Sequence, residues 1–139
     1  MSISVIIPYY NESETILLTL RSLACQSYEP DEVLLIDSGS TDKTSQVIDE
    51  WIKENKMKRY QNIYCGMMSP SSSVNKGIKS SKNKYIAYID CGLEIPEDWL
   101  LSNYNLIKEN RGEIVSVVIY TIGKNIIDQS FISQTYGYK

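Results

Sequence analysis

Residues 3–42 read ISVIIPYYNESETILLTLRSLACQSYEPDEVLLIDSGSTD, and this stretch determines the expected fold. It opens with the short apolar, β-branched run Ile3–Ile7, which Pro8 ends; such runs are typical of a strand buried in a parallel sheet. Leucine and isoleucine then recur at helical spacing as far as about Gln26. Glu32–Asp37 is a second compact apolar run. The stretch therefore predicts a strand, a helix and a second strand.

Polar residues predict where the first two helices begin. Asn11 followed by Glu14 makes a capping arrangement for the first helix. Ser40 or Thr41 can cap the second helix, with Asp42 in its first turn. That second helix carries its apolar face on Val47, Ile48, Trp51 and Ile52.

The rest of the chain continues the alternation. The further strands are expected at Gln61–Cys65, Tyr85–Ile89 and Ile114–Ile119. The further helices are a short one, which follows the polar loop Ser69–Ser73 and ends at Ser81, and one that starts at Pro96 with Glu97 and Asp98. Repeated βαβ units form a parallel sheet that is covered by helices on both faces. We expect an α/β fold in which residues 1–139 form a single domain.

The composition is that of an ordinary globular protein, with 42% apolar and 22% charged residues. The 14 basic and 17 acidic residues give a net charge of -3 and form no long run of one sign, which disfavours a nucleic-acid partner. No stretch reaches the roughly 20 apolar residues of a membrane span, and no signal peptide precedes the first strand. We expect a cytoplasmic protein, and peripheral membrane association stays open.

The sequence contains no histidine, which excludes Ser-His and Cys-His nucleophiles and the commonest zinc ligand. Its three cysteines, Cys25, Cys65 and Cys91, are far apart and resemble neither a disulfide framework nor a CxxC site. Any catalysis must therefore use carboxylates, hydroxyls, lysines or a hard metal ion.

Polar residues follow three of the expected strands, at Pro8–Glu12, Asp37–Ser40 and Asp90–Gly92. Ligands of open parallel sheets bind outside the carboxyl ends of the strands. A carboxylate at the end of a buried strand needs a partner, and for Asp37 a cap on the following helix is an equally good interpretation. Because its glycines stand alone here, the sequence lacks the P-loop and the dinucleotide fingerprint.

Tyr10 follows the first strand, where its ring can stack on a base. Most of the 11 tyrosines are expected to be packing or surface residues.

With these residues the sequence resembles the family 2 glycosyltransferases over most of its length. The matching motifs are P-x-Y-N-E at 8–12, Q-x-Y at 26–28, D-x-G-S-T-D at 37–42 and NKGIKSSKNKYIAYIDCGLEIPEDWL at 75–100. The resemblance implies the Rossmann-like GT-A fold, a three-layer αβα sandwich, and the N-terminal, nucleotide-sugar-binding part of such an enzyme. It implies a nucleotide-diphosphate-sugar donor, frequently a UDP-sugar, and a glycan or lipid-linked acceptor.

The resemblance also implies roles for single residues. Pro8, Tyr10 and Glu12 would line the base pocket, Asp37 would contact the base or ribose, and Asn75 and Gly77 would shape the pocket wall. Asp90 would be the first acid of the D-x-D element, near the ribose and a divalent cation, Mg²⁺ or Mn²⁺, that bridges the diphosphate. An inverting member needs a carboxylate base as well. In the family that base lies beyond residue 139, so the catalytic residue is not identified.

Several positions depart from the family pattern. Gly92 replaces the second acid of D-x-D, which leaves the cation to Asp90 with help from Glu94 or from other residues. Ser38 stands where many relatives have an aspartate, and Val74 where many have a basic residue. The alternative to a transferase domain is therefore a non-catalytic or degenerate binding module. A related nucleotidyltransferase would need a glycine-rich loop after the first strand, which Pro8–Asn11 does not provide.

Overall fold

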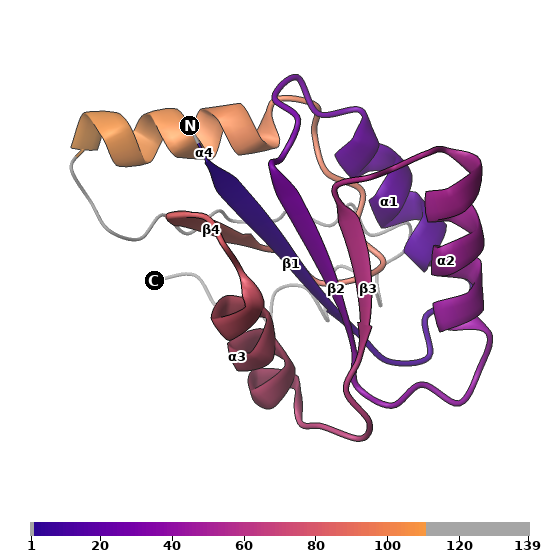
Figure 1. Ribbon diagram of the computed structural model, residues 1–139. Coiled ribbons are helices and arrows are strands. Elements are labelled where there is room, and N and C mark those ends of the chain that lie inside the picture. The colour runs from indigo at the N-terminus through magenta and orange to yellow at the C-terminus, as the bar shows by residue number, and fades with distance from the viewer. Residues whose placement is uncertain (1, 111–139) are drawn as a thin grey trace, which may run out of the picture. The chain divides into compact units, whose positions relative to one another are not determined.

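The computed structural model describes residues 2–110 (Figure 1). Residues up to Asn105 form one compact unit. The elements are β1 (Ile3–Tyr9), α1 (Ile16–Ala24), β2 (Glu32–Asp37), α2 (Thr44–Glu54), β3 (Tyr60–Tyr64), α3 (Pro70–Ser80), β4 (Tyr85–Tyr88) and α4 (Trp99–Asn110). The predicted strand Ile114–Ile119 lies outside the described residues, and the single domain stays a prediction. Within residues 2–110, every helix is too short or too polar to cross a membrane.

The four strands form one sheet in the order β3-β2-β1-β4, and every pair is parallel. Val5 in the middle of β1 lies opposite Val33 of β2 and Ala87 of β4. Because β2 and β3 extend the sheet in one direction and β4 returns to the other side of β1, the strand order reverses between β1 and β4. This confirms the predicted α/β class with a parallel sheet.

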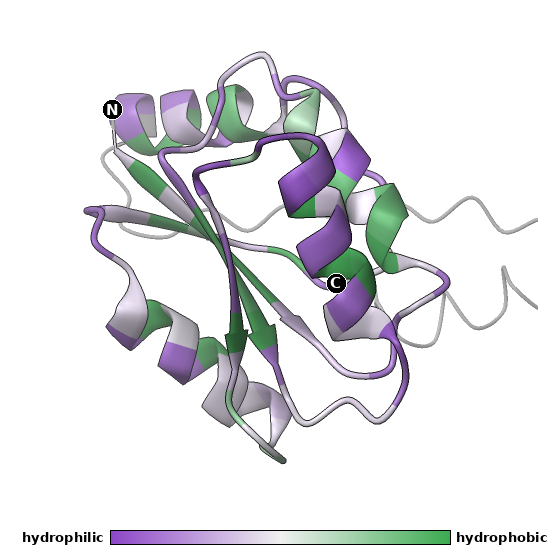
Figure 2. Ribbon diagram, turned by 45° about the vertical axis from the view of Figure 1, so that its right-hand side comes forward, coloured by the Kyte–Doolittle hydropathy of each residue, from purple (hydrophilic) through white to green (hydrophobic). Residues whose placement is uncertain are grey.

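Helices cover both faces of the sheet, as the hydrophobic residues at its centre require (Figure 2). One core joins alternate residues of β1 and β2 to α1, α2 and the start of α4, with Ile7, Leu20, Ile48 and Leu100 among its buried members. On the other face Ile6, Leu34 and Ile36 form a second cluster, and α3 packs on this side against β1 and β2. Parallel strands are joined by right-handed crossovers, so the direction in which the chain moves along the sheet decides which face a connecting helix covers. The connections through α1 and α2 move in one direction, and the connection to β4 through α3 moves in the other. α3 therefore lies on the opposite face from α1 and α2. The predicted three-layer αβα sandwich is confirmed.

Gly77 allows α3 to lie close to β1. A Cβ atom added at Gly77 would lie 2.4 Å from Cγ2 of Ile6, whose side chain is fully buried. Interiors are packed too densely to accept such an overlap without movement. Gly77 therefore supports the packing of the helix that carries Asn75.

The prediction that β1 ends at Pro8 is wrong, because the strand continues to Tyr9. The carbonyl of Ile6 accepts the N–H of Ile89 on the β4 side, and Pro8, two residues later, faces the same side. The β4 ladder ends opposite Ile6, so the N–H that proline lacks has no strand to pair with there. Pro8 is tolerated because this part of β1 is an edge.

Three predicted helix starts are wrong. α4 begins at Trp99, three residues after the predicted Pro96. α1 begins at Ile16 and α2 at Thr44, and their N-cap residues, Thr15 and Lys43, make no side-chain cap bond. Asn11 and Asp42 instead bond to each other's loops, as shown below. The loop Ser69–Ser73 is also mostly helical, because Ser69 caps α3 through the N–H of Ser72 and Pro70 takes the first helical position.

Strand predictions are accurate to within a residue or two at each end. β2 has the predicted bounds, and β3 begins and ends one residue earlier than expected. Its first residue, Tyr60, packs edge-on against Trp51 of α2, with ring centroids 5.5 Å apart. β4 ends at Tyr88, although the buried Ile89 still donates to β1.

Candidate functional site at the carboxyl edge of the sheet

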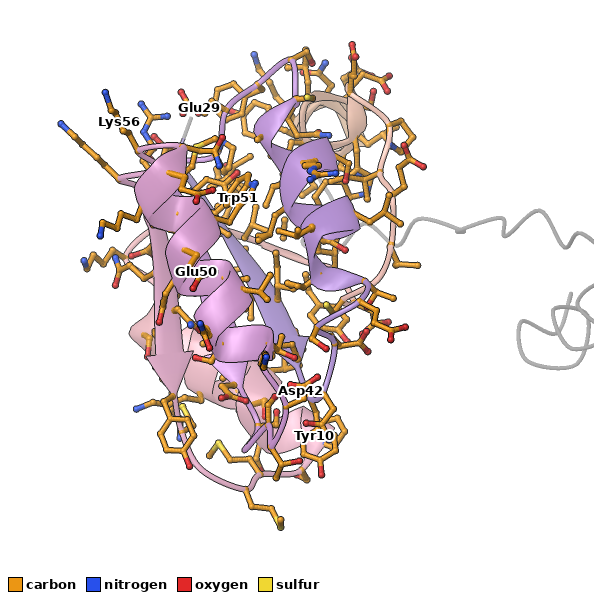
Figure 3. The ribbon with its side chains drawn as sticks, turned by 90° about the vertical axis from the view of Figure 1, so that its right-hand side faces the viewer. Tyr10, Glu29, Asp42, Glu50, Trp51 and Lys56 are labelled. Atoms are coloured by element: carbon orange, nitrogen blue, oxygen red, sulfur yellow. The ribbon has the colours of Figure 1, made fainter. Side chains whose placement is uncertain are left out.

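The carboxyl ends of β1, β2 and β4 lie along one edge of the sheet, because all three strands are parallel. Tyr10, Asp37 and Asp90 are therefore brought to the same edge. Figure 3 shows Tyr10 and Asp42 at this end, whereas Glu29 and Lys56 lie at the opposite end. The strand order reverses between β1 and β4, and such a switch point is where open α/β sheets bind ligands.

Two loops at this edge are joined by a set of hydrogen bonds that we call the loop clasp, made by Asn11–Ser13 after β1 and Ser40–Thr44 after β2. Three consecutive backbone N–H groups donate across it: Asn11 to Ser40 Oγ at 3.0 Å, Glu12 to Thr44 Oγ1 at 2.8 Å and Ser13 to Asp42 Oδ2 at 3.2 Å. Because side chains use these three donors, the loop after β1 does not offer them to a phosphate.

Backbone N–H groups of the loop after β2 also donate across the clasp, to a side chain of the loop after β1. Asn11 Oδ1 accepts the N–H of Thr41 at 2.8 Å and that of Asp42 at 3.3 Å. Asn11 adopts a φ of 54°, a left-handed conformation that asparagine tolerates better than most residues. Its side chain therefore organises the loop after β2 rather than α1.

Asp42 is the most strongly bonded carboxylate of the clasp. Oδ1 accepts the N–H and the hydroxyl of Thr44, and Oδ2 accepts the N–H of Ser13. Burial acts to raise the pKa of Asp42, but the hydrogen bonds from Thr44 and Ser13 outweigh it and lower the pKa to about 2. Asp42 is therefore ionised throughout the physiological range.

Asp37 is almost completely buried at the end of β2, and its Oδ1 accepts the N–H groups of Gly39 at 3.1 Å and Ser40 at 2.8 Å. Asp37 thus stabilises its own turn, and the alternative of a helix cap is wrong, because α2 begins only at Thr44. Within residues 2–110, Oδ2 makes no hydrogen bond, so one carboxylate oxygen can receive a ligand donor.

The loop after β3 lies directly against the turn at Asp37. Cys65 and Met68 donate their N–H groups to the carbonyls of Asp37 and Ser38. Gly39, with a φ of +95°, lies so close that an added Cβ would be 2.8 Å from the N atom of Met67. Only glycine fits this approach.

A buried pair of hydroxyls, Ser38 and Ser73, 2.6 Å apart, joins this turn to α3. α3 also carries Asn75, which is exposed, two residues before the buried Gly77. The structure thus places Asn75 on the outer side of α3 and Gly77 against the sheet.

Asp90 is exposed beyond the end of β4, and its Oδ1 accepts the hydroxyl of Tyr88. Burial, the hydrogen bond to Asp90 and its charge together raise the pKa of Tyr88 to about 12. The hydroxyl therefore stays protonated as a donor. The rest of the Asp90 carboxylate is exposed to solvent, so its charge at this edge carries little desolvation cost.

Gly92 follows in the same turn with a φ of +83°. An added Cβ would lie 3.5 Å from Thr15 and 3.7 Å from Oε2 of Glu12, so the turn after β4 adjoins the loop after β1. Burial raises the pKa of the Cys91 thiol to about 12, and the charges of Glu12 and Asp90 act in the same direction. Two of the three predicted donor-site acids, Glu12 and Asp90, therefore lie near Cys91.

The chemistry of Asp90 and Glu94 suits a hard divalent cation, because both present exposed carboxylate oxygens. Among residues 2–110, however, no three histidine, cysteine or acidic side chains come close enough to hold a metal ion alone. A cation here would need further oxygen ligands from a bound phosphate or from water.

A polar cavity of about 280 Å³ lies at the start of α1, lined by Asn11–Thr15 and Asp42. Of the predicted donor residues it includes only Glu12. This cavity therefore does not coincide with the site predicted from Tyr10, Asp37 and Asp90, and we assign it no ligand.

Sequence reasoning missed three residues that shape this edge. Thr44 joins the two loops of the clasp, Ser73 bonds to Ser38, and Thr19 of α1 donates to the carbonyl of Leu93 at 2.9 Å. Each is a fully buried hydroxyl. The only signal in the sequence is a serine or threonine at a position where the helical pattern requires an apolar residue.

Comparison with known proteins agrees with this geometry. The profile of the family described as "Glycosyl transferase family 2" matches residues 4–136. The poly(ribitol-phosphate) beta-glucosyltransferase of Bacillus spizizenii is 30% identical over 97% of this chain, which spans 22% of that protein.

Two solved structures share the fold. The structure of S. aureus TarS 1-349 in complex with UDP-GlcNAc superposes with a TM-score of 0.69 and 28% identity, over 80% of this chain and 32% of that one. A mannosyltransferase of Pyrobaculum calidifontis in complex with GDP-Man and Mn²⁺ superposes with a TM-score of 0.71 and 22% identity, over 77% of this chain and 32% of that one.

Proposed function

This chain belongs to glycosyltransferase family 2, and from that premise we propose that its carboxyl edge binds the nucleotide diphosphate of a UDP-sugar. The observation that carries the proposal is the convergence of Tyr10, Asp37 and Asp90 on adjacent strand ends, at the point where the strand order reverses. The UDP-GlcNAc complex of the relative TarS supports uracil as the base.

Each of these residues presents a group that suits one part of the donor. Tyr10 is 49% exposed, which leaves its ring available to stack on a base. The free Oδ2 of Asp37 can accept a donor of the base or ribose, while Oδ1 holds its own turn rigid. Asn75 and Pro8 lie on the elements beside this turn and would border the base.

The diphosphate requires positive charge from another source, since the clasp uses the amides of Asn11–Ser13. Asp90, with Glu94, would hold a divalent cation, which neutralises the charge that develops on the leaving diphosphate. Tyr88 holds Asp90 in place by its hydroxyl and keeps one oxygen of that carboxylate occupied.

We further propose that the complete protein transfers a hexosyl group to a glycan or lipid-linked acceptor, with inversion. Inversion requires a carboxylate base beside the acceptor hydroxyl. The residues that we assign to the donor leave that base unidentified. A cytoplasmic location and a peripheral membrane association stay predictions.

Calorimetry with UDP, GDP and TDP in the presence of Mn²⁺ tests the proposal. We expect UDP to bind, and we expect Asp37→Asn, which retains the oxygen that accepts from Gly39 and Ser40, to weaken binding about tenfold. Asp31→Asn is the matched control, because Asp31 accepts the N–H of Ile3 at the other end of the sheet. The proposal is wrong if the parent protein binds none of the three nucleotides.

One observation favours a second candidate, a module that binds a nucleotide sugar without turnover. Gly92 occupies the position of the second D-x-D acid with a left-handed φ, so the turn lacks a carboxylate that relatives have. Donor hydrolysis and transfer assays on a protein that also carries the catalytic base distinguish the candidates. UDP binding with turnover at background favours the module, and turnover that disappears in Asp90→Asn favours the transferase.

A further inference from the structure

We propose that Thr44 is a positioning residue for the nucleotide site: its hydroxyl holds the Tyr10–Glu12 segment in the geometry that binds the donor, without touching the donor itself. The inference rests on the proposed function, and it concerns a residue at the start of α2 that the motif comparison assigns to no role.

Thr44 lies at the centre of the loop clasp. Its side chain is fully buried, and its hydroxyl accepts the N–H of Glu12 at 2.8 Å while donating to Oδ1 of Asp42. A hydroxyl has one proton to donate, and this one goes to a carboxylate whose charge strengthens the bond. The oxygen of Thr44 is thereby oriented toward Glu12.

The bond matters for the site because of where Glu12 lies. Its N–H is in the middle of the three donors of the clasp, and the exposed ring of Tyr10 precedes it by two residues. On the other side, the Glu12 carboxylate approaches the turn at Gly92. Loss of the central bond would therefore move the base-stacking ring and this carboxylate together.

A purely structural role is the competing explanation, because removal of any buried hydroxyl lowers stability. Ser4 provides the comparison. Its side chain is as buried as that of Thr44, and its hydroxyl donates to Glu32 at 2.8 Å, but it lies at the opposite edge of the sheet. A structural effect would be shared by both residues, whereas a positioning effect belongs to Thr44 alone.

The test compares the UDP affinity of Thr44→Val, Thr44→Ser and Ser4→Ala in the full 139-residue chain with Mn²⁺, alongside thermal unfolding. Valine retains the shape and removes the hydroxyl, and we expect it to weaken UDP binding about tenfold. Serine retains the hydroxyl and should restore affinity to within about threefold of the parent. Ser4→Ala should lower the Tm and leave UDP affinity unchanged.

Amide hydrogen exchange gives a second readout that does not depend on UDP. Thr44→Val should speed the exchange of the Glu12 N–H, while Ser4→Ala should not. If Thr44→Val does not fold, Asp42→Asn tests the clasp from its exposed side, because one amide oxygen cannot accept from both Thr44 and Ser13; we expect about threefold weaker UDP binding.

The outcomes separate the two proposals. If the parent binds UDP and Thr44→Val binds it equally well, the positioning role is wrong and the proposed function stands. An equal loss of affinity in Ser4→Ala would show that only general stability is involved. Absence of UDP binding by the parent overturns the proposed function, and the positioning role with it.

Discussion

Two carboxylates at opposite edges of the sheet, Glu32 and Asp90, differ in how they are bonded. At the amino edge Glu32 is buried, and its oxygens are used by the hydroxyl of Ser4, by the N–H of Lys82 and by the ammonium group of Lys82 at 3.7 Å. At the carboxyl edge Asp90 is exposed and has one hydroxyl partner. The oxygens of Glu32 are occupied by protein donors, whereas among residues 2–110 Asp90 retains an unused acceptor.

Three exposed large hydrophobic side chains lie at the carboxyl edge. Tyr64, at 72% exposure, ends β3, and Tyr10 at 49% and Met67 at 85% follow the ends of β1 and β3. Open apolar surface is costly to a protein that does not use it, and contiguous open surface marks binding sites. The comparison predicts that the buried network at Glu32 contributes to stability and that the proposed donor binding depends on the other end of the sheet, so a substitution should change one without the other.

The largest effect is expected at the amino edge. Glu32→Ala leaves the buried hydroxyl of Ser4 and the part-buried N–H of Lys82 without their acceptor, which should lower the free energy of unfolding by about 2–3 kcal/mol. UDP affinity should not change. The control is Glu29→Ala, since Glu29 and Arg59 form an exposed ion pair and its loss should cost less than about 1 kcal/mol. Equal losses in urea denaturation would contradict the comparison.

The converse effect is expected at the carboxyl edge. Asp90→Asn should weaken UDP binding in the presence of Mn²⁺ about tenfold, because a neutral amide is a poor ligand for a hard cation. The Tm should stay within about 1 °C of the parent, since Asp90 is exposed. Asp98→Asn is a matched control, because Asp98 is also exposed and also accepts one hydroxyl, that of Ser102. A similar loss in the control would show that the effect is general to surface charge.

The elements that sequence predicted well are those that depend on local pattern. Glu32–Asp37 is a continuous apolar run and has the predicted bounds, because a strand covered on both faces needs such a run. The convergence of Tyr10, Asp37 and Asp90 was also predictable, because the carboxyl ends of parallel strands lie at one edge of the sheet.

The rest depends on partners distant in the chain. Asn11 was assigned to α1 because Glu14 follows it, but its side chain bonds to residues 30 and 31 positions away. The role of Thr44 was not predicted, because its partner Glu12 lies 32 positions away and no local sequence pattern indicates that the two residues bond. The pocket role of Gly77 stays a prediction, and its close approach to Ile6 was not predictable because it depends on packing between two layers.

A smaller effect is expected when Gly92 is replaced by aspartate. The φ of +83° disfavours a side chain, and the new carboxylate would adjoin Oε2 of Glu12, so the unliganded protein should lose about 1 kcal/mol of stability. In the presence of UDP the same carboxylate should strengthen Mn²⁺ binding severalfold. Gly92→Ala is the control for backbone strain alone. Titration of Mn²⁺ decides: no gain over Gly92→Ala would mean that residue 92 does not face the cation.

The smallest effect is the pH dependence of the loop clasp. Because hydrogen bonds from Thr44 and Ser13 hold the pKa of Asp42 at about 2, below that of the unfolded chain, ionised Asp42 favours the folded state. That contribution should be complete above about pH 4 and should disappear as the pH falls to about 2. The measurement is the difference in Tm between the parent and Asp42→Asn at pH 7, 4 and 2. This difference should stay the same between pH 7 and pH 4 and become smaller between pH 4 and pH 2. Thr44→Val removes the hydroxyl bond that helps to lower the pKa of Asp42. The Tm of this variant should therefore begin to fall at a higher pH than the Tm of the parent. A parent–Asp42→Asn difference that is the same at pH 7 and pH 2 would show that the clasp gains nothing from the charge of Asp42.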